Sequence, residues 1–252
     1  MEQKTPLDCK IANSQRIMRE MAKDQPIVIM WSGGRDSHSL VQLYEEMPEP
    51  KPPLEILTVN TGDWPEETKQ RLGILREQYT VTMLYSNARE QRAACGDPFD
   101  VVVQNEMSDL TAEQTPFACC WNNIMQPMHK FMTFECAHAR ACRGVKAVDN
   151  VPQSAATQIG PEYTIINPLW DWTDDDIKAY LKDMPTFYLL GAKSGVDCVT
   201  CTAYMKHENR VYMQQYYPAE YAETVKRVRA HTQKVQNLLG NYPAEFTEDT
   251  QP

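Results

Sequence analysis

Residues 27–40 read IVIMWSGGRDSHSL, and this stretch decides the fold. It opens with an uninterrupted apolar run, residues 27–31, which is typical of a strand buried on both faces of a parallel sheet. The pair Gly33–Gly34 then allows a sharp turn and a close backbone approach to a ligand. A helical pattern follows at 39–44, so a helix start points its unpaired N–H groups and positive dipole end at the loop. The stretch predicts a strand, a phosphate-binding loop and a helix.

The loop supplies the first candidate nucleotide ligands. Hydroxyl groups and a guanidinium add donors and positive charge to its backbone N–H groups. The GxxxxGK spacing of a Walker loop is absent, and a plain strand-to-helix turn is the alternative interpretation. The candidate set is Ser32, Gly33, Gly34, Arg35, Asp36 and Ser37. His38 could also touch phosphate, against the alternative of an exposed histidine at a helix start.

Outward from the loop, strands and helices alternate. Strands are predicted at 54–60 and 81–85, and the helix between them, 65–79, begins at Pro65. This rhythm predicts an α/β fold, an open and mainly parallel sheet with helices on both faces. Further predictions are a helix at 10–23, loops and short helices over 86–118, a helix at 122–133, a strand at 145–148, a helix capped by Thr173 and Asp176, and a helix at 218–239. The expected division is a nucleotide-binding domain, 1–205, and a helical C-terminal extension with a loose tail, 206–252.

Composition narrows the function classes. The 252 residues carry a formal net charge of −9, which argues against non-specific binding to nucleic acid. The sequence contains no run of eighteen apolar residues, so no membrane span is expected, and its polar start indicates a cytoplasmic protein. In a reducing compartment, clustered cysteines more often bind metal or perform redox chemistry than form structural disulfides.

Three segments resemble one family. The loop Ser32–Ser37 resembles the SGGxDS loop of the adenine nucleotide alpha-hydrolase (PP-loop) superfamily. Residues 60–68, NTGDWPEET, resemble the DTGxxFPET segment of the phosphoadenylyl sulfate (PAPS) and adenylyl sulfate (APS) reductases, with Asn60 and Trp64 as departures. Residues 167–177 resemble a third segment of that family, with a packing and helix-capping role. The resemblance implies that ATP or adenylyl sulfate, with Mg²⁺ as a further candidate, binds near Asn60, Thr61 and Gly62.

A later stretch, CRGVK at 142–146, resembles the part of the family that holds the terminal phosphate or sulfate. Lys146 fills the arginine position of the family, and Arg143 adds a second positive charge. The candidate ligands are therefore Arg143, Gly144 and Lys146, against the alternative of a solvated loop.

The cysteines form two clusters, a double cysteine at 119–120 and a CxxC at 198–201. This arrangement resembles the adenylyl sulfate reductases, which implies a [4Fe–4S] cluster held by Cys119, Cys120, Cys198 and Cys201. Four thiolates also suit zinc, and buried or unligated cysteines or a CxxC redox pair are further alternatives. Asn123 and Ile124 replace the family's Arg and Lys beside the cluster, which removes positive charge.

The reaction stays open between two mechanisms. The family's reductases carry a late nucleophilic cysteine, whereas no cysteine follows Cys201 here. Cys136 and Cys142, close to the 143–144 loop, are the candidate substitutes, since no motif places Cys9 or Cys95 there. The alternative is ATP cleavage to pyrophosphate with thiolation of a nucleic acid or small molecule, and a third option is a catalytically silent nucleotide-binding module. An electron or sulfur donor protein and a homodimer are further candidate partners.

Overall fold

The computed structural model describes residues 5–22, 25–100, 113–136, 139–149, 151, 156–159, 163–192, 195–205 and 207–240. A six-stranded sheet in the order β3-β2-β1-β4-β6-β5 forms its centre. All neighbouring strands are parallel except β5 and β6. The strands are β1 (Ile27–Met30), β2 (Leu54–Asn60), β3 (Thr80–Tyr85), β4 (Arg140–Cys142), β5 (Thr157–Ile159) and β6 (Thr164–Ile166). The predicted open, mainly parallel sheet is confirmed.

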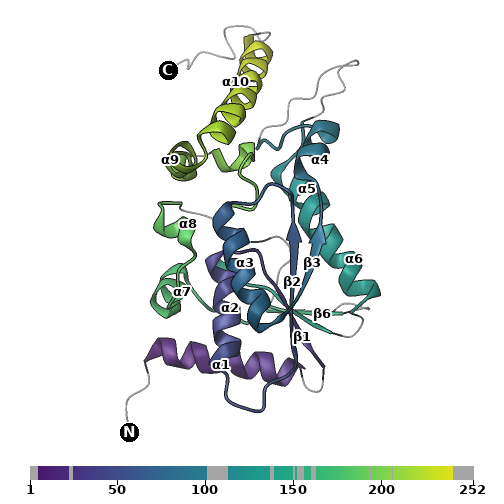
Figure 1. Ribbon diagram of the computed structural model, residues 1–252, viewed down its shortest axis with the longest axis vertical. Coiled ribbons are helices and arrows are strands. Elements are labelled where there is room, and N and C mark those ends of the chain that lie inside the picture. The colour runs from purple at the N-terminus through teal and green to yellow at the C-terminus, as the bar shows by residue number, and fades with distance from the viewer. Residues whose placement is uncertain are drawn as a thin grey trace, which may run out of the picture.

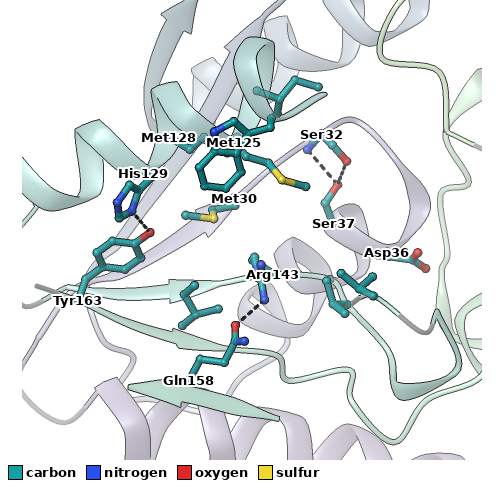
Figure 2. A pocket seen from close by; sticks show the side chains of 16 residues that line it. Met30, Ser32, Asp36, Ser37, Met125, Met128, His129, Arg143, Gln158 and Tyr163 are labelled. Carbon is teal, nitrogen blue, oxygen red and sulfur yellow. Dashed lines mark hydrogen bonds between the residues drawn. The ribbon is translucent and has the colours of Figure 1, made fainter. Parts of the chain in front are cut away.

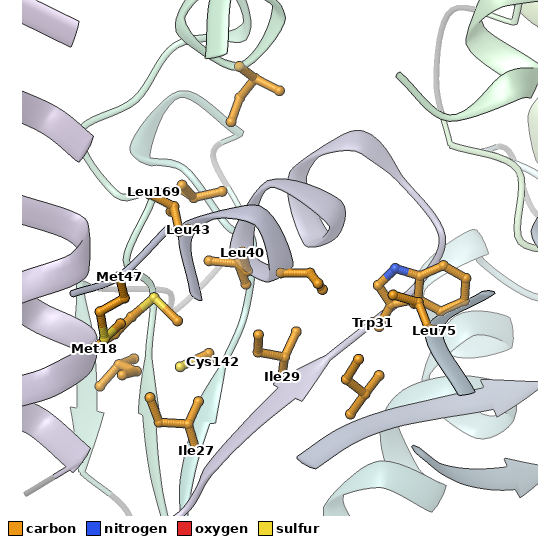
Figure 3. Packing of buried hydrophobic residues seen from close by; sticks show 14 of the residues in the cluster. Met18, Ile27, Ile29, Trp31, Leu40, Leu43, Met47, Leu75, Cys142 and Leu169 are labelled. Atoms are coloured by element: carbon orange, nitrogen blue, oxygen red, sulfur yellow. The ribbon is translucent and has the colours of Figure 1, made fainter. Parts of the chain in front are cut away.

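Alternating residues of β1 enter two separate cores, because successive side chains of a strand point to opposite faces. Ile27 and Ile29 join the larger core, where helices α1, α2, α3 and α7 contribute apolar residues (Figure 3). Val28 packs with Met128 and Met132 of α6 on the other face. Figure 1 shows α2 and α6 on opposite sides of the strands. The sheet is therefore covered on both faces, as the apolar run at 27–31 predicts.

The helices surround this sheet and continue past it toward the C-terminus. Thr173 caps α7: its hydroxyl accepts from the N–H of Asp176 at 3.2 Å, and the Asp176 carboxylate accepts from the N–H of Thr173 at 2.7 Å. This confirms the predicted cap. The α-helices are α1 (Pro6–Ala22), α2 (Arg35–Glu45), α3 (Glu66–Gln78), α4 (Ala88–Cys95), α5 (Pro116–Cys120), α6 (Gln126–Phe134), α7 (Asp174–Tyr180), α8 (Thr186–Leu189), α9 (His207–Tyr216) and α10 (Pro218–Gly240). A π-helical turn, η1 (Trp121–Met125), joins α5 to α6, and 3₁₀ turns are formed by η2 (Ala147–Asp149) and η3 (Thr202–Met205).

One predicted element is wrong. The strand expected at 145–148 lies instead at Arg140–Cys142, and residues Ala147–Asp149 form a 3₁₀ turn. The Lys146 side chain donates to the Asp36 carboxylate, and the N–H of Lys146 donates to the Asp149 carboxylate at 2.8 Å, so its backbone donor is used within the turn. The segment is therefore a loop at the carboxyl end of β4.

The boundary proposed at 205/206 stays a prediction, although α9 and α10 both contact η3. The expected loose tail after Tyr242 lies outside the described residues. None of the helices that the structure describes combines the length and the apolar character that a membrane span requires.

Candidate functional site

The loop after β1 is held in shape by its own serines. Ser37 Oγ accepts from the N–H of Ser32 at 3.3 Å and donates to the carbonyl of Gly34 at 3.0 Å. Gly33 has a φ of +81°, a left-handed conformation that favours glycine. Helix α2 begins directly after Gly34, so its first N–H groups face the loop. Loop, turn and helix start thus form a ready anion site.

The loop after β4 packs against this anion site. A Cβ atom added to Gly144 would lie 2.8 Å from the carbonyl carbon of Asp36 and 3.0 Å from the nitrogen of Ser37. Real Cβ atoms do not approach backbone so closely, so only glycine fits at 144. The predicted ligand Gly144 therefore lies beside the predicted ligands Asp36 and Ser37, at the carboxyl ends of β4 and β1.

Two of the three predicted cationic ligands, Lys146 and Arg35, are engaged with carboxylates. Lys146, which is 1% exposed, contacts Asp36 at 2.7 Å and Asp174 at 3.5 Å. Arg35 donates to Asp174 at 2.5 Å and its guanidinium lies over the ring of Tyr188. Burial raises the pKa of Asp36 and outweighs the opposing attraction of Lys146. Asp36 Oδ1 is buried and makes no hydrogen bond in the structure. Arg35 Nε lies 3.9 Å from that oxygen, so the charges brace the loop from outside.

A cavity of about 650 Å³ opens between this loop and α6. Figure 2 shows Ser32 and Ser37 at one end, His129 and Tyr163 at the other, and Met30 and Arg143 between them. At the polar positions, Tyr163 and His129 lie 2.9 Å apart and Arg143 donates to Gln158 at 2.8 Å. The lining residues are Met30, Ser32, Asp36, Ser37, Trp121, Ile124, Met125, Met128, His129, Arg143, Gly144, Val145, Val151, Gln158, Tyr163 and Ile165.

The cavity lies where the chain order of the sheet reverses. From β1 the chain moves to β2 and β3 on one side, and β4 lies on the other. Ligands of open α/β sheets bind at this switch point, outside the carboxyl ends of the strands. An apolar wall with a few polar groups is the usual construction of a small-molecule site.

Seven of the twelve predicted ligands do not line the cavity: Gly33, Gly34, Arg35, Asn60, Thr61, Gly62 and Lys146. Asn60 ends β2, and Thr61 and Gly62 follow it. Thr61 Oγ1 instead donates to the carbonyl of Asp197 at 3.0 Å and accepts from the thiol of Cys198 at 3.4 Å. This segment therefore supports the second cysteine pair. His38 also faces away from the cavity, since its Nδ1 accepts from Nε of Arg71 at 3.2 Å.

The four predicted metal ligands gather in one neighbourhood. Cys119, Cys198 and Cys201 are buried, Cys120 is half-buried, and none forms a disulfide. Burial raises the pKa of the Cys120 thiol to about 12, and the nearby Asp197, Cys201 and Cys119 act in the same direction. Four thiols of this kind suit an iron–sulfur cluster or zinc by chemistry. No three His, Cys, Asp or Glu side chains of the described residues are arranged to hold a metal, so the four thiols do not converge on a common point.

Comparison with known proteins identifies the family. The family model described as "phosphoadenosine phosphosulfate reductase domain" matches residues 26–202. The chain belongs to this family. No curated protein sequence matches it at a significant level.

Solved structures share the fold. Phosphoadenylyl-sulfate (PAPS) reductase from Candida auris, in a phosphate complex, is 14% identical, with a TM-score of 0.52 over 78% of this chain and 97% of that one. Yeast FAD synthetase in complex with FAD is 12% identical, with a TM-score of 0.50 over 79% and 68%. Candida glabrata FMN adenylyltransferase in complex with FAD and pyrophosphate is 11% identical, with a TM-score of 0.50 over 78% and 67%. The PAPS reductase family member described here therefore has the fold of PP-loop enzymes whose structures hold phosphate or adenine-containing ligands.

Sequence reasoning missed the side chains that hold the second cysteine pair of this PAPS reductase family member. Asp63, 3% exposed, accepts from the N–H of Thr200 at 3.1 Å and from its hydroxyl. Arg92 donates to Thr200 Oγ1, and Arg227 of α10 donates to its carbonyl, each at 2.5 Å. Thr200 lies inside the CxxC, so three charged residues fix this turn. Asp63 belongs to the quoted NTGDWP segment, whereas no local pattern points to Arg92 or Arg227.

The positions of the remaining cysteines argue against the predicted substitute nucleophiles. Cys142 is wholly buried in the larger core, which raises the pKa of its thiol. Cys136 precedes β4 and lies near Glu55 at the start of β2, the sheet edge opposite the cavity. The exposed Cys95, set aside in the sequence analysis, lies close enough to Cys119 to raise its pKa, behind the larger effect of burial. The two cysteines favoured by sequence therefore cannot present a thiolate to the cavity.

Proposed function

We propose that this protein binds an adenine nucleotide, ATP or adenylyl sulfate, in the cavity beside the SGGRDS loop. The observation that carries the proposal is the shape of the cavity, which joins an anion site to an apolar wall. Phosphates would lie against the N–H groups and hydroxyls of residues 32–37, and the base would lie along Met30 and the α6 side. Arg143 and Gln158 lie between these ends and supply polar contacts. Asp36 offers a carboxylate to a Mg²⁺ held mainly by the phosphates.

The proposed activity is nucleotide-dependent sulfur chemistry. Cys119, Cys120, Cys198 and Cys201 would hold a [4Fe–4S] cluster, with zinc as the alternative metal. When bound, such a cluster supplies a redox centre. The connection to the cavity is short, because Trp121 and Ile124 line it and lie directly after Cys119–Cys120 in the chain. This short connection would put the thiols beside the bound nucleotide.

Of the two mechanisms, the geometry favours ATP cleavage. A reductase of this family needs a thiolate that attacks the sulfur of the nucleotide, and Cys136 and Cys142 cannot reach it. In the ATP-cleaving reaction an oxygen of the acceptor attacks the α-phosphorus and pyrophosphate leaves, and a sulfur nucleophile then displaces AMP. The acceptor would be a nucleic acid or a small molecule, and the sulfur would come from a donor protein. Cytoplasmic location and a homodimer stay predictions.

The nucleotide site is tested by Gly34→Val. A Cβ at Gly34 would lie 3.4 Å from Ser32 Oγ and 3.8 Å from the Tyr188 hydroxyl, which are ordinary contacts. The loop therefore tolerates the added Cβ atom itself, and we expect the branched side chain to crowd the loop against which phosphate would lie. Calorimetry with ATP and with adenylyl sulfate should show loss of binding, while the thermal unfolding midpoint stays at the wild-type value. Unchanged affinity for both nucleotides would contradict the site.

The choice of mechanism is tested by intact-protein mass spectrometry. Anaerobically purified protein is incubated with adenylyl sulfate, and we expect no sulfonate adduct on any cysteine. The same preparation should contain about four irons per chain, or zinc if the alternative holds. An adduct on Cys95, Cys136 or Cys142 would establish the reductase mechanism instead. Nucleotide binding without an adduct and without pyrophosphate release from ATP, with bulk tRNA and DNA as trial acceptors, would favour the catalytically silent module.

A further inference from the structure

One face of α4 is turned toward three of the four cysteines, Cys119, Cys198 and Cys201. Ala88, Gln91, Arg92 and Cys95 have the spacing i, i+3, i+4, i+7, which places them on a single helix face. Ala88 packs against Cys198 and Cys201, and the Gln91 side-chain oxygen accepts from the thiol of Cys119 at 3.5 Å. Figure 1 shows α4 beside α5, and the two helices are in contact. Helix α4 therefore covers both halves of the cysteine site.

Arg92 is the charged residue on this face, and it is only 7% exposed. Its Nη2 donates to the Asp63 carboxylate at 3.0 Å and to Thr200 Oγ1 at 2.5 Å, which fixes the plane of the guanidinium. Its other terminal nitrogen, Nη1, is buried and has no hydrogen-bond partner. A buried N–H donor without an acceptor is costly, and more so in a charged group. The side chain is thus held rigidly with one strong donor to spare.

The surroundings of Arg92 point to the cysteines as the destination of this donor. Thr200, to which Arg92 donates, lies between Cys198 and Cys201, and Ala88, one helical turn before Arg92, packs against both cysteines. The residues after the double cysteine bring no charge, since Asn123 donates to Gln91 and to the Cys119 carbonyl, and Ile124 lines the cavity. A desolvated, four-thiolate metal site is anionic and needs a cation or donors around it. Arg92 meets that requirement from another helix.

We infer that Arg92 is a positioning residue of the cysteine site, whose Nη1 donates to a sulfur of the metal-bound thiolate site while Asp63 and Thr200 hold the guanidinium in place. The inference rests on the proposed function, because it requires a metal at these cysteines. It assigns the charge compensation of the site to α4 rather than to the helix that carries Cys119 and Cys120.

The test compares Arg92→Gln with Arg92→Lys and with a matched control, Arg89→Gln. Arg89 lies on the same helix and donates to the other oxygen of Asp63 at 3.0 Å, but it is 48% exposed and does not contact the cysteine turn. For Arg92→Gln we expect a roughly 10- to 100-fold loss of iron affinity in a chelator competition and a more negative reduction midpoint. Arg92→Lys keeps the charge and should recover most of the midpoint shift. Arg89→Gln should match the wild type in both measurements.

A second measurement uses the wild-type chain, in case Arg92→Gln does not fold. Protein labelled with ¹⁵N in the arginine guanidinium groups is reduced, and pulsed electron paramagnetic resonance should detect a ¹⁵N coupling to the cluster that Arg92→Lys lacks. A wild-type protein with a cluster but no such coupling, or an Arg92→Gln variant with unchanged iron affinity and midpoint, would overturn the inference alone. A wild-type protein that binds no metal would overturn the cluster and the inference together.

Discussion

The proposed nucleotide cavity and the cysteine site lie side by side at the carboxyl edge of the sheet, but they are built by opposite means. The cavity depends on the backbone: a turn with a positive φ at Gly33, a helix start, and Gly144, which packs against the backbone of the loop at 32–37. The cysteine site depends on side chains from distant segments, with Asp63, Arg92 and Arg227 meeting at Thr200. A backbone site tolerates changes of charge better than changes of volume, and the reverse holds for a buried charged site.

The largest effect that this contrast predicts is on stability at the cysteine site. Asp63→Asn removes the charge that Arg92 and Arg89 share, each at 3.0 Å. Breaking a buried ion pair by removing one partner costs about 3–5 kcal/mol. We expect a loss of that size in the free energy of unfolding from urea denaturation, together with loss of iron, because the CxxC turn is no longer fixed.

The control is Asp183→Asn. Asp183 pairs with Arg71 at 2.8 Å, but its side chain is 76% exposed, so the loss should stay under about 1 kcal/mol. Folded Asp63→Asn should still bind ATP, because Asp63 does not line the cavity. Equal losses for the two variants would remove the distinction between the sites.

The next effect is on nucleotide affinity at the cavity. Gly144→Ala adds a Cβ at 2.8 Å from the backbone of Asp36, so the loop at 32–37 must shift. Overpacking of this kind costs about 1–3 kcal/mol. If the whole of that cost is subtracted from the free energy of binding, affinity for ATP drops roughly 5- to 150-fold, at about 1.4 kcal/mol per factor of ten. Calorimetry measures the change.

Gly73→Ala is the matched control for Gly144→Ala. Gly73 lies within α3, and a Cβ there meets nothing within 4 Å. Alanine in a helix interior should add about 0.5–1 kcal/mol of stability and leave ATP affinity unchanged. Two variants with equal affinity would show that the contact between the loops does not shape the site.

The same contrast explains how far the sequence reaches. The cavity could be predicted from its loop because the strand, the glycines, the serines and the helix start are contiguous in the sequence. The sheet could be predicted from the apolar runs and the alternation of strands and helices. Lys146 was assigned to phosphate, yet it is buried against Asp36 and Asp174, which lie 110 and 28 positions away in the chain. The four cysteines could be predicted as a group by resemblance. Arg92 could not be predicted in this way. It lies on a helix whose sequence pattern is weak, and its partner Thr200 follows more than a hundred residues later in the chain.

The smallest effect concerns the side of the phosphate loop that faces away from the cavity. His38 lies in the first turn of α2 and packs against Arg71. Burial, the larger cause, and the nearby Arg71 together lower the pKa of His38 from 6.5 to about 4, against the opposing effect of Asp183. Since the folded-state pKa lies below the unfolded value, the neutral histidine contributes stability that is complete above pH 6.5. That contribution is lost as the pH falls toward about 4. Because the His38 ring is neutral, it adds no charge at the start of α2, and the positive end of the helix dipole acts on the phosphate side alone.

His38→Gln removes this titration and leaves a neutral side chain that can still accept from Arg71. We expect the stability difference between wild type and variant to be constant above pH 6.5 and to shift by about 1–2 kcal/mol in favour of the variant on acidification to pH 4.5, after allowance for solvent screening. Urea denaturation at several pH values measures the difference, and the carboxylates common to both proteins cancel. Curves that stay parallel across this range would show that His38 takes up its proton at the same pH in the folded and unfolded protein, and so is protonated in the folded state below its ordinary pKa of 6.5. The phosphate loop would then carry a second cation behind it, and the distinction between a backbone site and a charge-built site would weaken.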